Sequence, residues 1–129
     1  MAELIQITDT ATFLPALESL SQEQETVIVI LTGTVDPSSG KNWCPDCERA
    51  KPNINKHVIA NAAGRKILMG IVKREEWSGR ADHPYKQSAL LKARGVPTIL
   101  LIAGGEVVMR AEKDEDFENE ELLKAFTEQ

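Results

Sequence analysis

The chain has 129 residues, of which 42% are apolar and 27% are charged, and its formal net charge at pH 7 is −5. Such a chain can bury a hydrophobic core, so we expect one domain over residues 1–129. The negative charge disfavours nucleic acid and anionic membranes, which both select a basic patch. No apolar run approaches the roughly 18 residues of a membrane span, and the N-terminus does not read as a signal peptide. We therefore expect a cytoplasmic protein.

The first third of the chain predicts a strand, a helix and a second strand. Alternating apolar residues predict the first strand over 4–7, and Thr8 or Asp9 can cap the following helix. The apolar residues at helical spacing are Phe13, Leu14, Leu17 and Leu20. Pro15 lies inside this pattern and predicts a kink or a later start. The β-branched run over 26–31 is apolar on both faces, which predicts a strand covered on both sides.

The middle of the chain predicts a loop and a long helix. Residues 32–42 are rich in glycine and serine and contain an Asp-Pro pair, which predicts a loop. The helix is expected to begin at or just before Cys44 and to run toward Gly64, which would end it. Pro52 lies within it and predicts a kink.

The second half of the chain predicts three strands and two helices. The strands are expected over 67–72, 96–102 and 106–109, and the last two are joined as a hairpin by Gly104-Gly105. The helices are expected from Pro84 to Gly95 and over 117–127. Residues 73–83 predict a polar surface loop. The resulting order, β-α-β-α-β-α-β-β-α, predicts an α/β fold with a central mixed β-sheet flanked by helices on both faces.

Both cysteines lie in one short motif, Trp43-Cys44-Pro45-Asp46-Cys47, at the expected start of a helix. Unpaired backbone N–H groups and the helix dipole favour a negative charge there. The pKa of Cys44 should therefore fall below about 8.5, the value of a free thiol. Its thiolate can attack a substrate disulfide, and Cys47, one turn later, can resolve the mixed disulfide. This pattern predicts a thiol–disulfide oxidoreductase.

Two other uses of the cysteine pair stay open on these residues alone. A structural zinc site needs four ligands, and the remaining candidates, His57 and His83, are not spaced as a zinc knuckle. A purely structural disulfide would close a very small loop, worth only about 2 kcal/mol, in a reducing compartment. Both uses are less favoured than redox chemistry, so no metal is expected. We expect both histidines on the surface, because nothing near them completes a catalytic arrangement.

Five residues are expected to shape the site around the thiol pair. Trp43 should shield one face of the pair and line the substrate surface. Pro45 lacks an N–H and suits a first helical turn, so it stiffens the motif. Asp46 suits a helix start but disfavours a neighbouring thiolate, so it should keep the pKa of the nucleophile from falling very low. A cis peptide between Val96 and Pro97 would expose the Val96 backbone to a partner.

With these residues in place, the chain resembles the thioredoxin superfamily over nearly its full length. The resemblance is carried by the cysteine motif, by Pro52 and by the segment Gly95-Val96-Pro97-Thr98. Within the superfamily the chain is similar to the thioredoxin domain-containing protein 17 family. That similarity lies in Leu31-Thr32-Gly33-Thr34 and in the end of the following loop, Gly40-Lys41-Asn42, which runs into the motif.

The resemblance implies a thioredoxin fold, a cis Pro97 packed against the cysteine pair, Cys44 as the exposed nucleophile and Cys47 as the resolving thiol. It also implies a disulfide reductase that binds no cofactor and receives electrons from NADPH through thioredoxin reductase. Disulfide-containing proteins and small disulfides such as cystine are the implied substrates. We expect a monomer that binds neither nucleic acid nor membrane.

The chain differs from the family pattern in two places, and these differences limit what the resemblance implies. Ordinary thioredoxins carry a buried acid on the strand before the motif, and residues 26–31 contain none. The segment after Trp77 also differs from the family pattern, so substrate choice does not carry over. Lys41, Asn42 and Trp77 remain the candidate substrate-facing residues.

The predicted function is a cytoplasmic protein-disulfide and cystine reductase. The alternative is a redox-gated binding module, in which the state of the Cys44–Cys47 pair switches the docking of a signalling partner. Both need an intact pair, so the sequence separates them poorly. A glutathione-dependent enzyme is less favoured, because the acid between the cysteines and the net negative charge of the domain would repel the carboxylates of glutathione.

Overall fold

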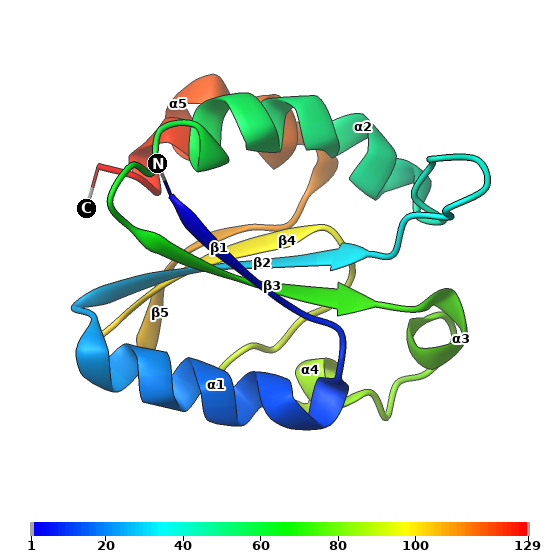
Figure 1. Ribbon diagram of the computed structural model, residues 1–129, viewed down its shortest axis with the longest axis horizontal. Helices are drawn as coiled ribbons and strands as arrows, with labels where there is room; N and C mark the ends of the chain where they lie inside the picture. The colour runs from blue at the N-terminus through cyan, green and yellow to red at the C-terminus, as the bar shows by residue number, and fades with distance from the viewer. Residues whose placement is uncertain (1, 129) are drawn as a thin grey trace.

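The structure is a computed structural model that describes residues 2–128, and its centre is a mixed sheet with helices on both faces (Figure 1). The sheet has the strand order β1-β3-β2-β4-β5. Its strands are β1 (Glu3–Ile7), β2 (Thr26–Gly33), β3 (Lys66–Val72), β4 (Thr98–Ala103) and β5 (Glu106–Ala111). The predicted α/β class and the layered arrangement are confirmed.

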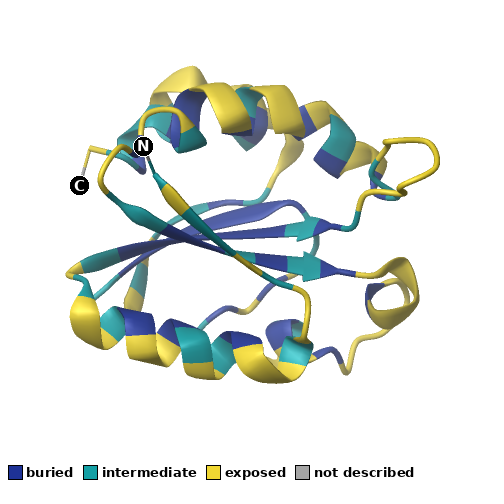
Figure 2. Ribbon diagram, viewed as in Figure 1, coloured by how far each residue is buried: buried dark blue, intermediate teal, exposed yellow. Residues whose placement is uncertain are grey.

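The pairing of the strands follows from their connections. β1 and β2 both run parallel to β3, and a helix lies in each connection, as parallel strands require. β4 is antiparallel to both β2 and β5, and the turn at Gly104-Gly105 makes the predicted β4–β5 hairpin. The central strands β2 and β4 are buried along nearly their whole length, as their continuous apolar runs predict (Figure 2).

Helical segments cover the two faces of the sheet. They are α1 (Thr10–Glu23), α2 (Pro45–Ile54), α3 (Arg74–Trp77), α4 (Pro84–Gln87) and α5 (Glu120–Ala125), with a π-helix η1 (Asn55–Ile59) and a 3-10 helix η2 (Asp114–Glu118). α2 and α5 lie over one face, and α1 and α4 lie over the other (Figure 1). Each face has its own apolar core, one around Phe13 and Leu17, the other around Ile54 and Phe126.

Two predicted helices begin as expected but are interrupted or short. The helix after Cys44 begins at Pro45, changes to the π-helix η1 after Ile54, and is over before Gly64, whose φ is +79°. The predicted helix from Pro84 to Gly95 ends already at Gln87. Its continuation fails because Ser88 takes an extended conformation and Lys92 has a positive φ of 45°.

The other helical predictions differ in detail. Asp9 caps α1 by accepting a hydrogen bond from the N–H of Ala11, and the helix runs through Pro15 from Thr10 without a later start. The predicted helix over 117–127 is replaced by η2 and α5, because Asn119 between them is extended and caps α5 with its side chain.

The prediction of a polar surface loop over 73–83 is right for residues 73–76 and 78–82, which are exposed, but wrong in two respects. This segment contains α3, and two of its side chains belong to the core: Trp77 is 5% exposed and His83 is 4% exposed. The His83 ring lies edge-on against both Trp77 and Tyr85, at 4.8 Å and 4.6 Å between ring centroids. Burial of aromatic surface therefore places His83 inside, against the expectation from its polarity.

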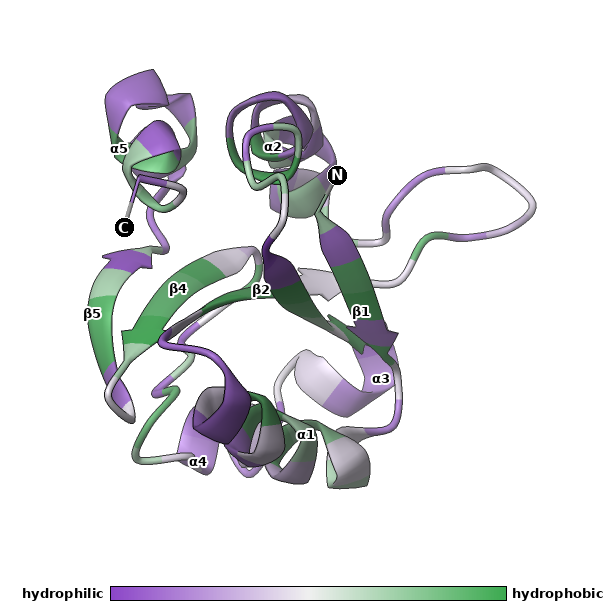
Figure 3. Ribbon diagram, turned by 60° about the vertical axis from the view of Figure 1, so that its left-hand side comes forward, coloured by the Kyte–Doolittle hydropathy of each residue, from purple (hydrophilic) through white to green (hydrophobic). Residues whose placement is uncertain are grey.

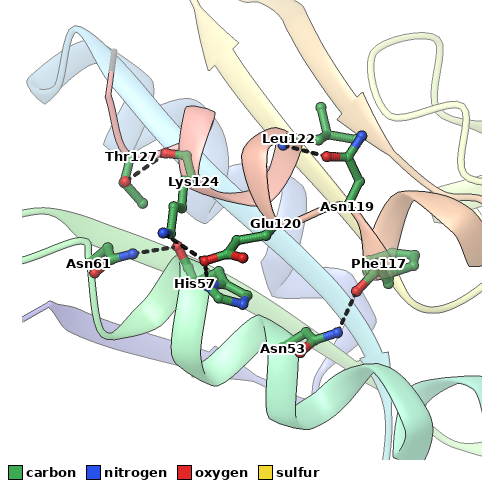
Figure 4. Close-up of polar contacts among 9 residues, drawn as sticks. All are labelled: Asn53, His57, Asn61, Phe117, Asn119, Glu120, Leu122, Lys124 and Thr127. Atoms are coloured by element: carbon green, nitrogen blue, oxygen red, sulfur yellow. Dashed lines mark hydrogen bonds and ion pairs between the residues drawn. The ribbon is translucent and has the colours of Figure 1, made fainter.

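His57 is also buried, at 7% exposure, so the prediction of a surface position is wrong for both histidines. It lies in η1 beneath α5, where its Nδ1 is 3.8 Å from the Glu120 carboxylate (Figure 4). Lys124, one turn along α5, contacts the same carboxylate at 2.7 Å. The Asn53 amide donates to the Phe117 carbonyl, so this polar set joins the end of α2 to the C-terminal helices.

Candidate active site

The loop between β2 and α2 carries the chain from the sheet to the cysteine motif and projects from the body of the fold (Figure 3). Its two arms are held together by an isolated bridge between Val35 and Asn42. At its tip the Asp36 carboxylate accepts from the N–H and the hydroxyl of Ser38, at 2.9 Å and 2.7 Å, which lowers the pKa of Asp36. The loop therefore has a defined, hydrogen-bonded conformation, and it ends at Cys44.

Asn42 fixes the last step of this loop. Its Nδ2 donates to the Gly33 carbonyl at 2.8 Å, and its Oδ1 accepts from the Cys44 N–H at 3.0 Å. Its own backbone N–H donates to the Glu48 carboxylate at 3.1 Å, one turn inside α2. These bonds join the end of β2, the loop and the start of α2 at one residue.

Trp43 lies against the end of the sheet. Its indole N–H donates to the Val72 carbonyl at the end of β3, at 3.0 Å. A Cβ placed on Gly33 would come within 2.5 Å of the Asn42 side chain and 2.8 Å of the Trp43 ring. Glycine at this position is what allows Trp43 and Asn42 to approach the end of β2 so closely.

Cys44 occupies the N-cap position of α2, and both cysteines are free thiols. Its Sγ accepts a hydrogen bond from the Cys47 N–H at 3.1 Å. The hydrogen bond from the Cys47 thiol, the Cys47 backbone N–H and the charge of Arg49 lower the pKa of Cys44 to about 7, although burial acts in the opposite direction. A pKa near neutrality gives a substantial thiolate fraction at neutral pH.

Cys47 has the opposite electrostatic character. The hydrogen bond that the Cys47 thiol donates to Cys44 raises the pKa of Cys47 far above the ordinary value, and burial adds to this rise. The Thr32 hydroxyl and the Gly33 backbone act in the opposite direction. The site therefore divides the pair into a readily ionised first thiol and a protonated second thiol.

Both thiols are largely covered, since Cys44 is 5% exposed and Cys47 is 3% exposed. The expectation of an exposed nucleophile is therefore wrong for the reduced protein. One covering element is the segment before β4, where the expected cis peptide bond between Val96 and Pro97 is present. The Val96 carbonyl lies 3.4 Å from the Cys44 Sγ and accepts its hydrogen bond when the thiol is protonated.

Asp46 is exposed in the first turn of α2 and forms an ion pair with Arg49, three residues on. Arg49 is also the cation that lowers the pKa of Cys44. We therefore expect Asp46 to act on the nucleophile indirectly, by offsetting part of the Arg49 charge. Its i,i+3 spacing to Arg49 was readable in the sequence, and so this contact could have been predicted.

The structure gathers some of the predicted site residues and separates others. Trp43, Asn42 and Val96 contact the motif or the strand ends that hold it. Trp77 does not face a substrate, because its ring is buried beneath Lys86, whose Nζ is 4.4 Å from the ring centroid. Lys41 is exposed on the loop. Thr32, Glu48 and Arg49 were not predicted. Thr32 and Glu48 act on the site through contacts between separate segments, whereas Arg49 pairs with Asp46 within α2.

The residues that the structure describes contain neither a metal-binding cluster nor a membrane-spanning helix. Within residues 2–128, no group of three or more histidine, cysteine or acidic side chains is arranged to hold a metal ion. Over the same range, no helix has the length and apolar character needed to cross a bilayer.

Solved structures of thioredoxins share this architecture. A thioredoxin from Nicotiana alata superposes with a TM-score of 0.57 at 20% identity, covering 91% of this chain and 88% of its own. At this identity the likeness establishes the fold alone, and the predicted thioredoxin fold is confirmed. A close cysteine pair at the start of α2 makes this a thioredoxin-like domain with a candidate redox dithiol.

The particular family is given by the sequence. Residues 6–129 match the family described as "Thioredoxin domain-containing protein 17-like, thioredoxin domain", and the chain belongs to it. A protein of Arabidopsis thaliana named "Thioredoxin-like protein Clot" is 36% identical over a region that covers 60% of this chain and 58% of that protein.

A second relative, from Leishmania braziliensis, is named "Acireductone dioxygenase" and is 34% identical over 67% of this chain. The matched region is 26% of that protein, so the chain corresponds to about a quarter of its length.

Proposed function

We propose that this protein is a cytoplasmic disulfide reductase that acts on protein disulfides and on small disulfides such as cystine. The observation that carries the proposal is the asymmetry of the thiol pair. Cys44 has a pKa of about 7 and accepts a hydrogen bond from the Cys47 N–H, while the pKa of Cys47 is raised. This is the division of labour that sequential thiol–disulfide exchange requires.

In the first step the Cys44 thiolate attacks one sulfur of the substrate disulfide. A bond forms between Cys44 and that sulfur, the substrate S–S bond breaks, and the other sulfur leaves as a thiolate. The positive charge of Arg49 and the N–H of Cys47 stabilise the attacking anion before the reaction.

In the second step Cys47 gives its proton to water and attacks the Cys44 sulfur. The mixed disulfide breaks, the second substrate thiolate leaves, and a Cys44–Cys47 disulfide remains. The cystine or protein disulfide has then gained two electrons. The Thr32 hydroxyl and the Gly33 backbone, which favour the ionised form of Cys47, support this step.

The oxidised pair must be reduced again for turnover. We propose that thioredoxin reductase supplies the electrons from NADPH and that the protein itself binds no cofactor. Membership of a thioredoxin-like family supports this route.

The test is NADPH consumption by the protein with thioredoxin reductase and cystine, compared with Cys44→Ser and Cys47→Ser. We expect turnover by the wild type and none by either variant, with a mixed disulfide trapped on Cys44 in Cys47→Ser. Glutathione with glutathione reductase is the control donor and should not support turnover. A pair that oxidises and reduces reversibly without any turnover would contradict a reductase and favour the redox-gated binding module.

A further inference from the structure

A hollow of about 350 Å³ lies beside the resolving cysteine, between α2 with η1 and the strands β1, β2 and β3. Cys47 forms part of its wall together with Thr32, the residue whose hydroxyl acts on the Cys47 thiol. The loop before the motif closes one end with Val35, which is 46% exposed. The volume is at the lower end of the range of small-molecule sites.

The lining of the hollow is mostly apolar and carries one kind of charge. Its aliphatic wall is formed by side chains of the sheet and of α2, among them Leu4, Ile30, Ile54, Met69 and Ile71. Among the described residues that line it, Lys51 is the one with a charged side chain. Lys51 follows Cys47 by four residues on α2, so the two lie on one face of the helix.

The Lys51 ammonium is available to a ligand. In the part of the chain that the structure describes, it forms no ion pair, whereas Arg49 on the same helix is paired with Asp46. Asn55, one further turn along, adds an amide to the same rim. The lining also contains the amides of Gln6 and Asn42, which are neutral. An apolar wall with a single cation among neutral polar groups is complementary to a molecule with an apolar body and one negative charge.

We propose that this hollow binds an amphipathic monocarboxylate, with the carboxylate at Lys51 and Asn55 and the alkyl chain along the sheet against Cys47. Cys47 is only 3% exposed, and the bound chain displaces solvent from the hollow beside it. Because a thiolate is disfavoured in apolar surroundings, occupancy opposes ionisation of Cys47 and slows its attack on a mixed disulfide. This effect on exchange rests on the proposed function, whereas the binding does not.

The binding test uses decanoate with the reduced chain of 129 residues, followed by NMR of the backbone amides. We expect saturable one-to-one shifts at Cys47, Lys51 and Ile71. Decylammonium, which has the same alkyl chain and the opposite charge, is the matched probe and should bind more weakly. Equal binding of both probes, or shifts that avoid the lining, would overturn the proposal.

Variants test the contribution of the Lys51 charge to binding separately from that of the volume of the hollow. Lys51→Gln should weaken decanoate binding about twofold to fivefold, the usual size for an exposed ion pair. Lys56→Gln removes an exposed lysine outside the lining and should leave binding unchanged. Ile71→Phe should abolish binding by filling the hollow, with thermal denaturation to establish that the variant is folded. Equal affinity of the two lysine variants would contradict a carboxylate site at Lys51.

The effect on exchange is measured without thioredoxin reductase, by stopped flow with the aromatic disulfide dithiobis(nitrobenzoate). Attack by Cys44 releases one thionitrobenzoate, and attack by Cys47 on the resulting mixed disulfide releases the second. Saturating decanoate should slow the second release several-fold and leave the first within about twofold. If decanoate binds but the second release does not change, the proposed effect on Cys47 is overturned. If both releases occur but the protein shows no NADPH turnover, only the proposed reduction by thioredoxin reductase is contradicted.

Discussion

The Oδ1 atom of Asn42 accepts a hydrogen bond from the backbone N–H of Cys44 at 3.0 Å, while its Nδ2 donates to the Gly33 carbonyl at 2.8 Å. A side chain next to the motif thus fixes the nucleophile to the end of β2. Neither bond belongs to the regular backbone hydrogen bonding of a helix or strand. Both are made by the side-chain amide of Asn42.

Replacing this amide should loosen the start of α2. We expect Asn42→Ala to lower the free energy of unfolding by about 1–3 kcal/mol, because two part-buried hydrogen bonds are lost. Urea denaturation of the reduced protein measures the change. Gln22→Ala, at an exposed position of α1, is the control and should differ little from wild type. A loss no larger than that of the control would show that the loop is held without Asn42.

The lowered pKa of Cys44 has a consequence for stability. Because the folded protein lowers this pKa from 9.0 to about 7, it holds the thiolate at a pH where the unfolded chain is still protonated. The stabilisation is complete above pH 9, decreases as the pH falls, and is lost below pH 7. We therefore expect the reduced wild type to gain stability between pH 7 and 9 relative to Cys44→Ser. Urea denaturation at each pH measures the free energy of unfolding of both proteins. If the two proteins change in parallel over this range, folding does not lower the pKa of Cys44.

The strands and the core of the site were predictable because their signals are local. Continuous apolar runs define β2 and β4, and the two cysteines are adjacent in a motif at a helix start. The parts that were not predicted depend on tertiary contacts. Thr32 reaches the Cys47 thiol from a different element, and nothing in its neighbourhood in the sequence reports that contact.

The errors have the same origin. Residue type alone places histidine at the surface, yet His83 is held between two aromatic rings that come from separate short helices. The helix after Pro84 has no breaking residue before Gly95 in the sequence. It stops early because the chain folds back, where the Ala93 N–H donates to the Tyr85 carbonyl and Arg110 of β5 donates to the Leu91 carbonyl.

The pairing of Asp46 with Arg49 predicts how the motif tunes its nucleophile. Asp46→Asn should lower the pKa of Cys44 below about 7, because the Arg49 charge is no longer neutralised and acts more strongly on the thiolate. Arg49→Gln should raise it. Titration of the thiolate by its ultraviolet absorbance measures both, with Cys44→Ser giving the background. A pKa that does not fall in Asp46→Asn would show that Asp46 has no such role.

Acid should destabilise the protein through His83. Burial, and then the charge of Lys86, lower the pKa of His83 below 6.5, and the opposing charges of Glu76 and Asp82 do not restore it. The folded state therefore resists a proton that the unfolded chain accepts. The contribution of neutral His83 is fully present above pH 6.5 and is lost as the pH falls through its lowered pKa.

His83→Asn tests this without removing the cap on α4. His83 Nδ1 accepts from the Tyr85 N–H at 3.1 Å, and an asparagine oxygen can accept the same bond. We expect the variant to be less stable than wild type at pH 8, because ring contacts with Trp77 and Tyr85 are lost. Its stability should fall less steeply than that of wild type below pH 6.5, the ordinary pKa of the imidazole. Denaturant midpoints across this range measure the slopes, and equal slopes would place the acid sensitivity elsewhere in the molecule.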